Sequence, residues 1–210
     1  MRPLAILIVV WVILIPVGVS GQSDIPPKIR QRTPPLASDH DPITKTERTS
    51  WLINSVIGPK SLAAGVASAG WNTALNLPEE YGSHVSGFAK RYAMRFPSLI
   101  TDNAIEAGLG SLWDEDPRYF RSGERAPWRR LRHAATMTVF AYRKDGSIAP
   151  AYGRYAGVVG SNFLSNTWGP RSEDSINSAL TRVALGFTGG FLGNVFDEFW
   201  NDVRNRIRRR

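Results

Sequence analysis

The sequence predicts an all-α protein, a compact bundle of about six helices that pack closely along glycine- and alanine-rich seams. Three observations support this fold class. Beyond residue 43, apolar residues recur at helical spacing, small residues lie four apart on several segments, and proline or glycine separates one segment from the next. The 210 residues are 42% hydrophobic and include no cysteine, so packing rather than disulfide bonds must stabilise the domain.

The N-terminus is expected to direct export. Residues 1–21 start with a basic residue, continue through an apolar run and end in small residues, which is typical of a secretory signal peptide. The alternative is an uncleaved anchor, because the uncharged run from Leu4 just reaches the length of a spanning helix. No cysteine follows the run, which excludes a lipoprotein N-terminus. Residues 22–43 are rich in proline and predicted to be a flexible tether, so the single helical domain comprises residues 44–210.

Capping signals and prolines place the first helices. Thr44 and Glu47 have the spacing of a capping box, which predicts a helix that begins there. Pro59 predicts the start of a second helix, which carries small residues four apart. Pro78, followed by two glutamates, predicts the start of a third helix, and Pro97 is expected to end it.

The second half is predicted to alternate between helices and turns. Three helices are expected before the last one, over residues 98–113, 128–142 and 150–168. Residues 114–127 hold two prolines and a glycine, which indicates an ordered loop. Asp145 and Gly146 form a turn signal, and a short hairpin on its flanks is the alternative to continuous helix there. Ser172 is predicted to cap the last helix.

The last helix combines an apolar stripe with a run of glycines. At about 100° per residue, one face collects its large apolar side chains: Leu185, Leu192, Phe196, Phe199, Val203 and Ile207. The predicted helix-packing glycines lie beside that stripe: Gly186, Gly189, Gly190 and Gly193. The pattern predicts a packing seam. The uncharged run of 183–196 is about 21 Å long as a helix, shorter than a bilayer core of about 30 Å.

The net positive charge is explained most simply by ordinary solubility, whereas the arginines near the C-terminus indicate an anionic partner. The formal net charge is +8, and five arginines lie near the C-terminus, namely Arg204, Arg206, Arg208, Arg209 and Arg210. Some of them compensate the helix dipole, and the surplus suits an anionic membrane surface or a cell-wall polymer. No nucleic-acid partner is expected for an exported protein. The small-residue faces also allow copies of the chain to form a homo-oligomer.

Carboxylates in two regions are the candidates for catalysis. Asp102 and Glu106 stand one helical turn apart, where like charges repel. The predicted acidic loop contributes Asp114, Glu115 and Asp116. A metal or an acid–base pair is the functional interpretation, whereas salt bridges to nearby arginines are the interpretation that the sequence favours. The acids near the C-terminus, Asp197, Glu198 and Asp202, are likewise expected to form ion pairs, with Arg204 and Arg206 within reach.

Several catalytic signatures are missing from the sequence. The motifs HExxH, GxSxG and GxxxxGK[ST] do not occur, which removes the signatures of zinc proteases, α/β-hydrolases and P-loop enzymes. Glu80 and His84 are four residues apart, not the three of helical di-iron sites, and no second such pair accompanies them. No cofactor and no metal are therefore expected.

Five short motifs carry a resemblance: TKTER (44–48), GPKSL (58–62), GFAKRYA (87–93), EDPRYF (115–120) and NVFDEFWND (194–202). In this order they resemble those of a group of uncharacterised exported bacterial proteins, over roughly residues 44–206. The resemblance implies a single helical domain after a signal and a tether. It implies no activity and contributes no catalytic residues.

Together these patterns predict a non-enzymatic protein of the periplasm or cell envelope, structural or bound to the membrane surface. Two alternatives stay open. The first is an envelope hydrolase that uses a carboxylate or metal site, which requires its carboxylates to converge on one concave surface. The second is an integral membrane protein with glycine-zipper helices.

Overall fold

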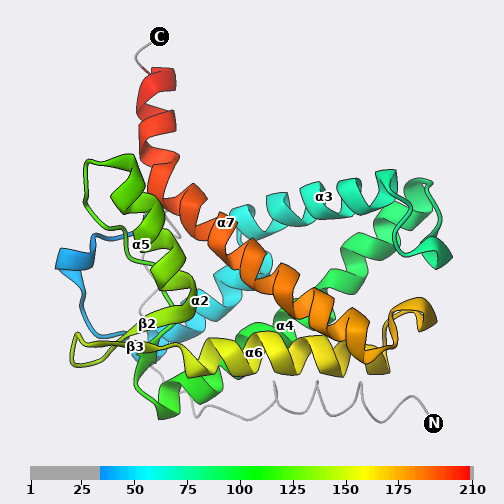
Figure 1. Cartoon of the computed structure of the whole chain (residues 1–210), viewed down its shortest axis with the longest axis horizontal. Coiled ribbons are helices and arrows are strands. Elements are labelled where there is room, and N and C mark those ends of the chain that lie inside the picture. Colours follow the sequence, from blue (N-terminus) through cyan, green and yellow to red (C-terminus); the bar gives the residue numbers. More distant parts are fainter. Residues whose placement is uncertain (1–33, 209–210) are drawn as a thin grey trace, which may run out of the picture. The chain divides into compact units, whose positions relative to one another are not determined.

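The computed structural model describes residues 34–208, which are mostly helical (Figure 1). The α-helices are α2 Lys45–Ile57, α3 Pro59–Ala74, α4 Val85–Leu112, α5 Pro127–Val139, α6 Tyr152–Leu164 and α7 Ile176–Arg208. An antiparallel sheet has the order β1-β2-β3, with β1 Glu115–Asp116, β2 Phe140–Arg143 and β3 Ile148–Pro150. Short 3-10 helices are Ala37–Asp39, Glu79–Tyr81, Ser165–Thr167 and Arg171–Glu173. The prediction of a predominantly helical protein is confirmed.

Part of the predicted tether packs against the loop before α5 and against β2. The predicted signal peptide, the tether up to residue 33, and Arg209 and Arg210 lie outside the described residues. Within residues 34–43, the amide of Ala37 donates to the carbonyl oxygen of Arg121 at 2.8 Å. The ring of His40 stacks on Tyr142 with 5.0 Å between centroids. Because these partners come from much later in the chain, local composition gave no sign of the packing, and the compact unit begins before residue 44.

Helix α2 begins as its capping box predicts. The amide of Glu47 donates to Thr44 Oγ1 at 3.2 Å, and the amide of Thr44 donates to Glu47 Oε2 at 2.9 Å. The backbone hydrogen bond from Thr44 lowers the pKa of the Glu47 carboxyl. Helix α3 has Pro59 in its first turn, also as predicted.

Helix α4 does not have the predicted boundaries. The residues after Pro78 form only a short 3-10 turn, and α4 begins at Val85. Gly82 has a φ of 74°, which turns the chain before the helix starts. Arg91, a buried residue of α4, stabilises this turn. Its guanidinium donates to the carbonyl oxygens of Leu77, Pro78 and Gly82 at 2.6, 2.8 and 2.6 Å.

Pro97 lies inside α4 and does not end it, so the prediction of two helices on either side of this residue is wrong. A proline removes one helical hydrogen bond. The helix continues because it is packed along its length, on α3 before the proline and on α6 after it. The resulting long helix contacts α2, α3 and α6, which lie at different places along it (Figure 1).

Helices α4 and α6 approach closely through glycines. A Cβ atom on Gly153 of α6 would lie 2.8 Å from the Cα of Gly110 in α4. One turn later, a Cβ on Gly157 would lie 2.6 Å from Asp102 Oδ1. Both distances are shorter than real Cβ contacts, so this crossing needs residues without side chains.

The remaining boundaries show two corrections. Helix α5 ends at Val139, and the chain then forms the β2–β3 hairpin around Gly146, which has a φ of 81°. Helix α7 begins at Ile176, and the Ser175 hydroxyl accepts from the amide of Ser178 at 3.1 Å. Ser172 is not its cap, because its hydroxyl instead donates to Glu80 Oε2 at 2.8 Å.

Candidate functional site

The first candidate acids lie in the interior between α4 and α6. Glu106 Oε1 accepts from Arg154 Nε at 3.0 Å, and Arg154 also donates to the carbonyl oxygen of Met137 at 2.6 Å. Asp102 has no such cation, and its Oδ1 is buried without a hydrogen-bond partner in the described chain. Burial, followed by repulsion from Glu106, raises the pKa of the Asp102 carboxyl to about 7. The two acids therefore lie close together where α6 packs on α4, with Glu106 buried and Asp102 half-buried.

The acids of the loop are engaged in structural bonds. The Glu115 carboxylate accepts from the amides of Tyr152 and Gly153 at 2.9 and 2.8 Å, which places a negative charge at the N-terminus of α6. Asp116 accepts from Arg118 Nη2 at 2.7 Å and from Arg118 Nε at 3.0 Å. Both carboxylates are buried. Asp114, by contrast, is exposed and has a φ of 56°.

A small hollow lies where this region meets the N-terminal residues. Its cavity volume is about 30 Å³, and it is lined by His40, Pro42, Ile43, Arg48, Asp114, Asp116 and Lys144. His40 Nε2 is buried and lies 3.9 Å from Asp116 Oδ2, too far for a hydrogen bond. The lining mixes both signs of charge at a size below that of ordinary ligand pockets. Within residues 34–208, no three histidine or acidic side chains are arranged to hold a metal ion.

A second buried network joins α7 to α5 and to the loop before it. Glu198 accepts from the hydroxyls of Tyr119 and Ser122 at 2.7 and 2.6 Å, and from Arg130 Nε at 3.2 Å. Burial opposes ionisation of Glu198, but the hydrogen bonds from Ser122 and Tyr119 outweigh it and lower the pKa of its carboxyl. Burial, together with the bond to Glu198, raises the pKa of the Tyr119 hydroxyl. The network therefore holds a charged carboxylate inside the fold.

The cations of this network differ from those expected. Arg130 pairs with Asp202 as well as with Glu198, and Lys60 of α3 pairs with Asp197. Arg204 and Arg206 form none of these salt bridges. The sequence predicted ion pairs at these acids correctly but missed their partners, because Arg130 and Lys60 are distant in sequence and adjacent only in the fold.

The apolar stripe of α7 faces outward, so its predicted role as a packing seam is wrong. Leu185, Leu192, Phe196, Val203 and Ile207 are all exposed, with Leu185 at 62% and Ile207 at 67%. The sixth residue of the stripe, Phe199, is half-buried, and the Arg130 guanidinium lies 4.1 Å from its ring centroid. The opposite face, which includes Ala179 and Glu198, packs on α5 and α6 and is buried. The physical reason is the buried hydrogen-bond network: Glu198 can reach Tyr119, Ser122 and Arg130 only if its own face turns inward.

The four glycines of α7 have different surroundings. A Cβ on Gly186 would lie 2.9 Å from Val158 Cγ1, so this glycine allows α6 to approach. A Cβ on Gly190 or Gly193 would make ordinary contacts at 3.9 Å, with Thr138 and Lys60 respectively. A Cβ on Gly189 would meet nothing within 4 Å. Close packing in α7 is therefore concentrated at its Gly186 end.

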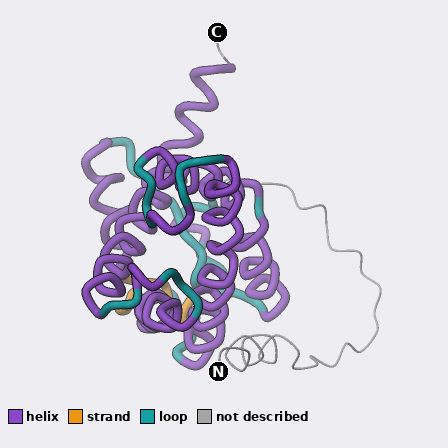
Figure 2. Tube along the Cα trace, turned by 90° about the vertical axis from the view of Figure 1, so that its right-hand side faces the viewer, coloured by secondary structure: helices purple, strands orange, loops and turns teal. Residues whose placement is uncertain are grey.

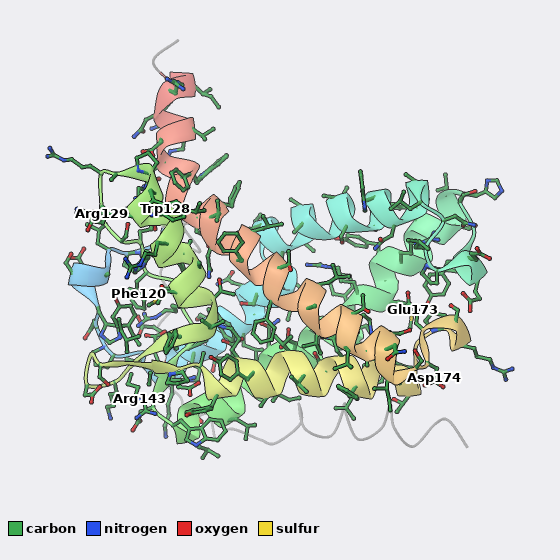
Figure 3. All side chains as sticks on the ribbon, in the orientation of Figure 1. Phe120, Trp128, Arg129, Arg143, Glu173 and Asp174 are labelled. Carbon is green, nitrogen blue, oxygen red and sulfur yellow. The ribbon has the colours of Figure 1, made fainter. Side chains whose placement is uncertain are left out.

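Charged and aromatic side chains also extend from the surface. Arg204, Arg206 and Arg208 are exposed on the last turns of α7, and none of them forms a salt bridge within residues 34–208. Trp128 and Arg129 point away from the start of α5 (Figure 3). The surface thus carries apolar and basic groups, while several acids are buried.

Comparison of the chain with protein-family models, curated proteins and solved structures gives no match. None of the helices within residues 34–208 has both the length and the apolar character that a membrane span needs.

Proposed function

We propose that the protein is a non-enzymatic, membrane-associated structural protein of the bacterial cell envelope. Residues 1–21 act as its export signal, and about six helices that pack closely through glycine and alanine form its folded domain. The observation that carries the proposal is the outward apolar face of α7, which ends in arginines. A surface of this kind needs an apolar partner with negative charge, and a membrane supplies both.

The extent of the apolar face supports this proposal. From Leu185 to Ile207 the exposed side chains follow one side of a continuous helix, a distance of about 33 Å. Single exposed apolar residues are ordinary on protein surfaces, but several large ones on the same side of one helix are typical of an interaction site. The buried residues of the same helix are instead Ala179 and the hydrogen-bonded Glu198.

The arrangement of the acids favours this function over hydrolysis. A catalytic carboxylate must reach its substrate or the attacking water. Glu106, Glu115 and Asp116 instead accept hydrogen bonds from arginines or backbone amides that connect separate elements. Asp102 is half-buried, and its Oδ1 lies against Gly157 of α6 rather than in an open cleft. Glu106, Glu115 and Asp116 therefore act as internal ties within the fold.

The test is vesicle flotation of the full chain. Neutral phosphatidylcholine vesicles give the baseline, which includes any binding by the apolar N-terminal segment. We expect vesicles with 30 mol% phosphatidylglycerol to bind more protein, and the excess to fall between about 0.05 and 0.5 M salt because screening weakens surface electrostatics. Equal binding to both vesicle types at low salt would overturn the proposal.

A further inference from the structure

The C-terminal end of α7 extends beyond the rest of the fold. Figure 1 shows the last turns projecting past α5, and Figure 2 shows the helix that leads to the C-terminus with no other helix beside its last turns. The bond from Arg130 to Asp202 is the last tie to α5, and residues 203–208 are all exposed. They make no hydrogen bond or ion pair with another described element. This end of the helix is therefore unsupported by the protein itself.

The projecting end is amphipathic. Trp200, Val203 and Ile207 recur at intervals of three and four residues and are exposed. At about 100° per residue, Arg204 and Arg206 fall on opposite flanks of this apolar stripe. Trp200 stacks on Phe196 with 5.0 Å between centroids, which continues the stripe toward the body.

Compensation of the helix dipole does not explain this pattern. It accounts for basic residues in the last turn, such as Arg206 and Arg208, but not for bulky apolar residues between them. A few unsupported turns are marginally stable in water, and exposure of isoleucine and tryptophan adds an unfavourable hydration term. Both problems disappear if the apolar stripe is covered.

The charges beside the apolar stripe indicate which partner covers it. A second copy of the chain would bring the same arginines together, which is unfavourable. An anionic polymer would satisfy the arginines but would leave the apolar stripe in water. The boundary between headgroups and acyl chains of an anionic bilayer accepts apolar side chains, while arginines on either flank reach the lipid phosphates.

We propose that residues 200–208 lie in the plane of an anionic membrane, with Trp200, Val203 and Ile207 inserted below the headgroups. Arg204, Arg206 and Arg208 bind the lipid phosphates, with the guanidinium groups extending from the helix flanks. This assignment rests on the proposed membrane association and identifies the element and the lipid chemistry that produce it. The other exposed apolar side chains play a secondary part in binding.

Paired variants of the full chain test the assignment. Val203→Ser with Ile207→Ser removes the apolar stripe, and Arg204→Gln, Arg206→Gln and Arg208→Gln together remove the flanking charge. The matched controls are Ile53→Ser with Val66→Ser on α2 and α3, and the triple change of Arg125, Arg129 and Arg132 to Gln. All control positions are exposed, so each pair of variants makes equal chemical changes at different places.

We expect both α7 variants to lower affinity for vesicles with 30 mol% phosphatidylglycerol by about tenfold or more, since each basic residue near such a surface contributes appreciably. Each control is expected to change affinity by less than about twofold. Lipids brominated near the headgroup should quench wild-type fluorescence more than that of Trp200→Phe. Circular dichroism of each variant checks that the helices are retained.

The other outcomes separate this inference from the function on which it rests. If the wild type shows no preference for anionic vesicles, the proposed function itself fails. If it binds and the α7 variants bind equally well, or the controls weaken binding as much, membrane association stands and this assignment is overturned. Loss with the arginine variant alone overturns insertion in favour of purely electrostatic attachment. If the α7 variants lose self-association of the chain but keep their lipid binding, the assignment is overturned in favour of contact with a second copy.

Discussion

Gly157 of α6 lies directly against Asp102 of α4. A Cβ atom on Gly157 would come within 2.6 Å of Asp102 Oδ1 and within 2.8 Å of the carbonyl oxygen of Asp102. A backbone oxygen cannot move without displacing the helix, so the two helices can cross at this depth only with glycine at this position.

Substitution of Gly157 should destabilise the folded state. Gly157→Ala is expected to lower the free energy of unfolding by about 1–3 kcal/mol, because the new methyl group overpacks the crossing. Urea denaturation followed by circular dichroism measures the change. Gly108→Ala on α4 is the control, since a Cβ there would meet nothing within 4 Å. It should be neutral or stabilising by up to about 1 kcal/mol. Equal destabilisation by both variants would contradict the close approach.

Asp102 should make stability depend on pH. Its pKa is raised from 3.8 to about 7 in the folded chain, so the folded state binds this proton more tightly than the unfolded chain does. The stabilisation is complete below about pH 4 and is lost as pH rises to about 7, by at most about 4 kcal/mol. Glu106 on the same helix and Arg154 on α6 are the charged groups that face it.

Asp102→Asn removes this titration and should flatten the pH dependence. From pH 4 to pH 7.5 the unfolding free energy of the variant is expected to rise relative to that of the wild type. Urea denaturation at several pH values measures it. Asp174→Asn, at an exposed position, serves as the control and should follow the wild type. Parallel curves for wild type and Asp102→Asn would contradict the raised pKa.

The two acids that contact Arg130 should differ in their contribution to stability. Glu198→Gln is expected to lower the unfolding free energy by about 2–3 kcal/mol, because a buried charge pair with several hydrogen bonds is disrupted. Asp202→Asn removes a partner that is 61% exposed, and its effect should stay below about 1 kcal/mol. Thermal and urea unfolding of the two variants provide the comparison. A larger loss for Asp202→Asn would exclude Glu198 as the main tie.

The capping box of α2 provides a local test. Thr44→Ala removes the acceptor for the amide of Glu47 and should lower the unfolding free energy by about 1 kcal/mol. Thr46→Ala, two residues further along the same helix, changes an exposed side chain and should have little effect. Hydrogen exchange of the first-turn amides shows whether the loss is local. Unchanged protection in Thr44→Ala would contradict the cap.

Features set by neighbouring residues were predictable from the sequence. The capping box at Thr44, the proline in the first turn of α3 and the turn at Gly146 depend on local backbone chemistry, and the structure has all three. The predicted end at Pro97 depended on the same kind of rule and was wrong, since packing of α4 on its neighbours outweighs one missing hydrogen bond.

Contacts between distant residues could not be predicted in the same way. The residues next to Glu198 in the sequence do not indicate its hydrogen-bond partners, which are Tyr119, Ser122 and Arg130. The outward direction of the α7 stripe follows from those contacts, because periodicity identifies a face but not which face is buried. The packing of His40 was not predicted for the same reason, because its aromatic neighbour Tyr142 is remote in the chain.

The tight turn between β2 and β3 offers a practical consequence. Residues 144–147 are exposed, and a Cβ on Gly146 would meet nothing within 4 Å. Exposed turn tips tolerate insertions better than packed elements do. A short epitope placed at Gly146 should therefore leave the fold intact, and antibody access to that epitope in intact and permeabilised cells would report on which side of the membrane the protein resides.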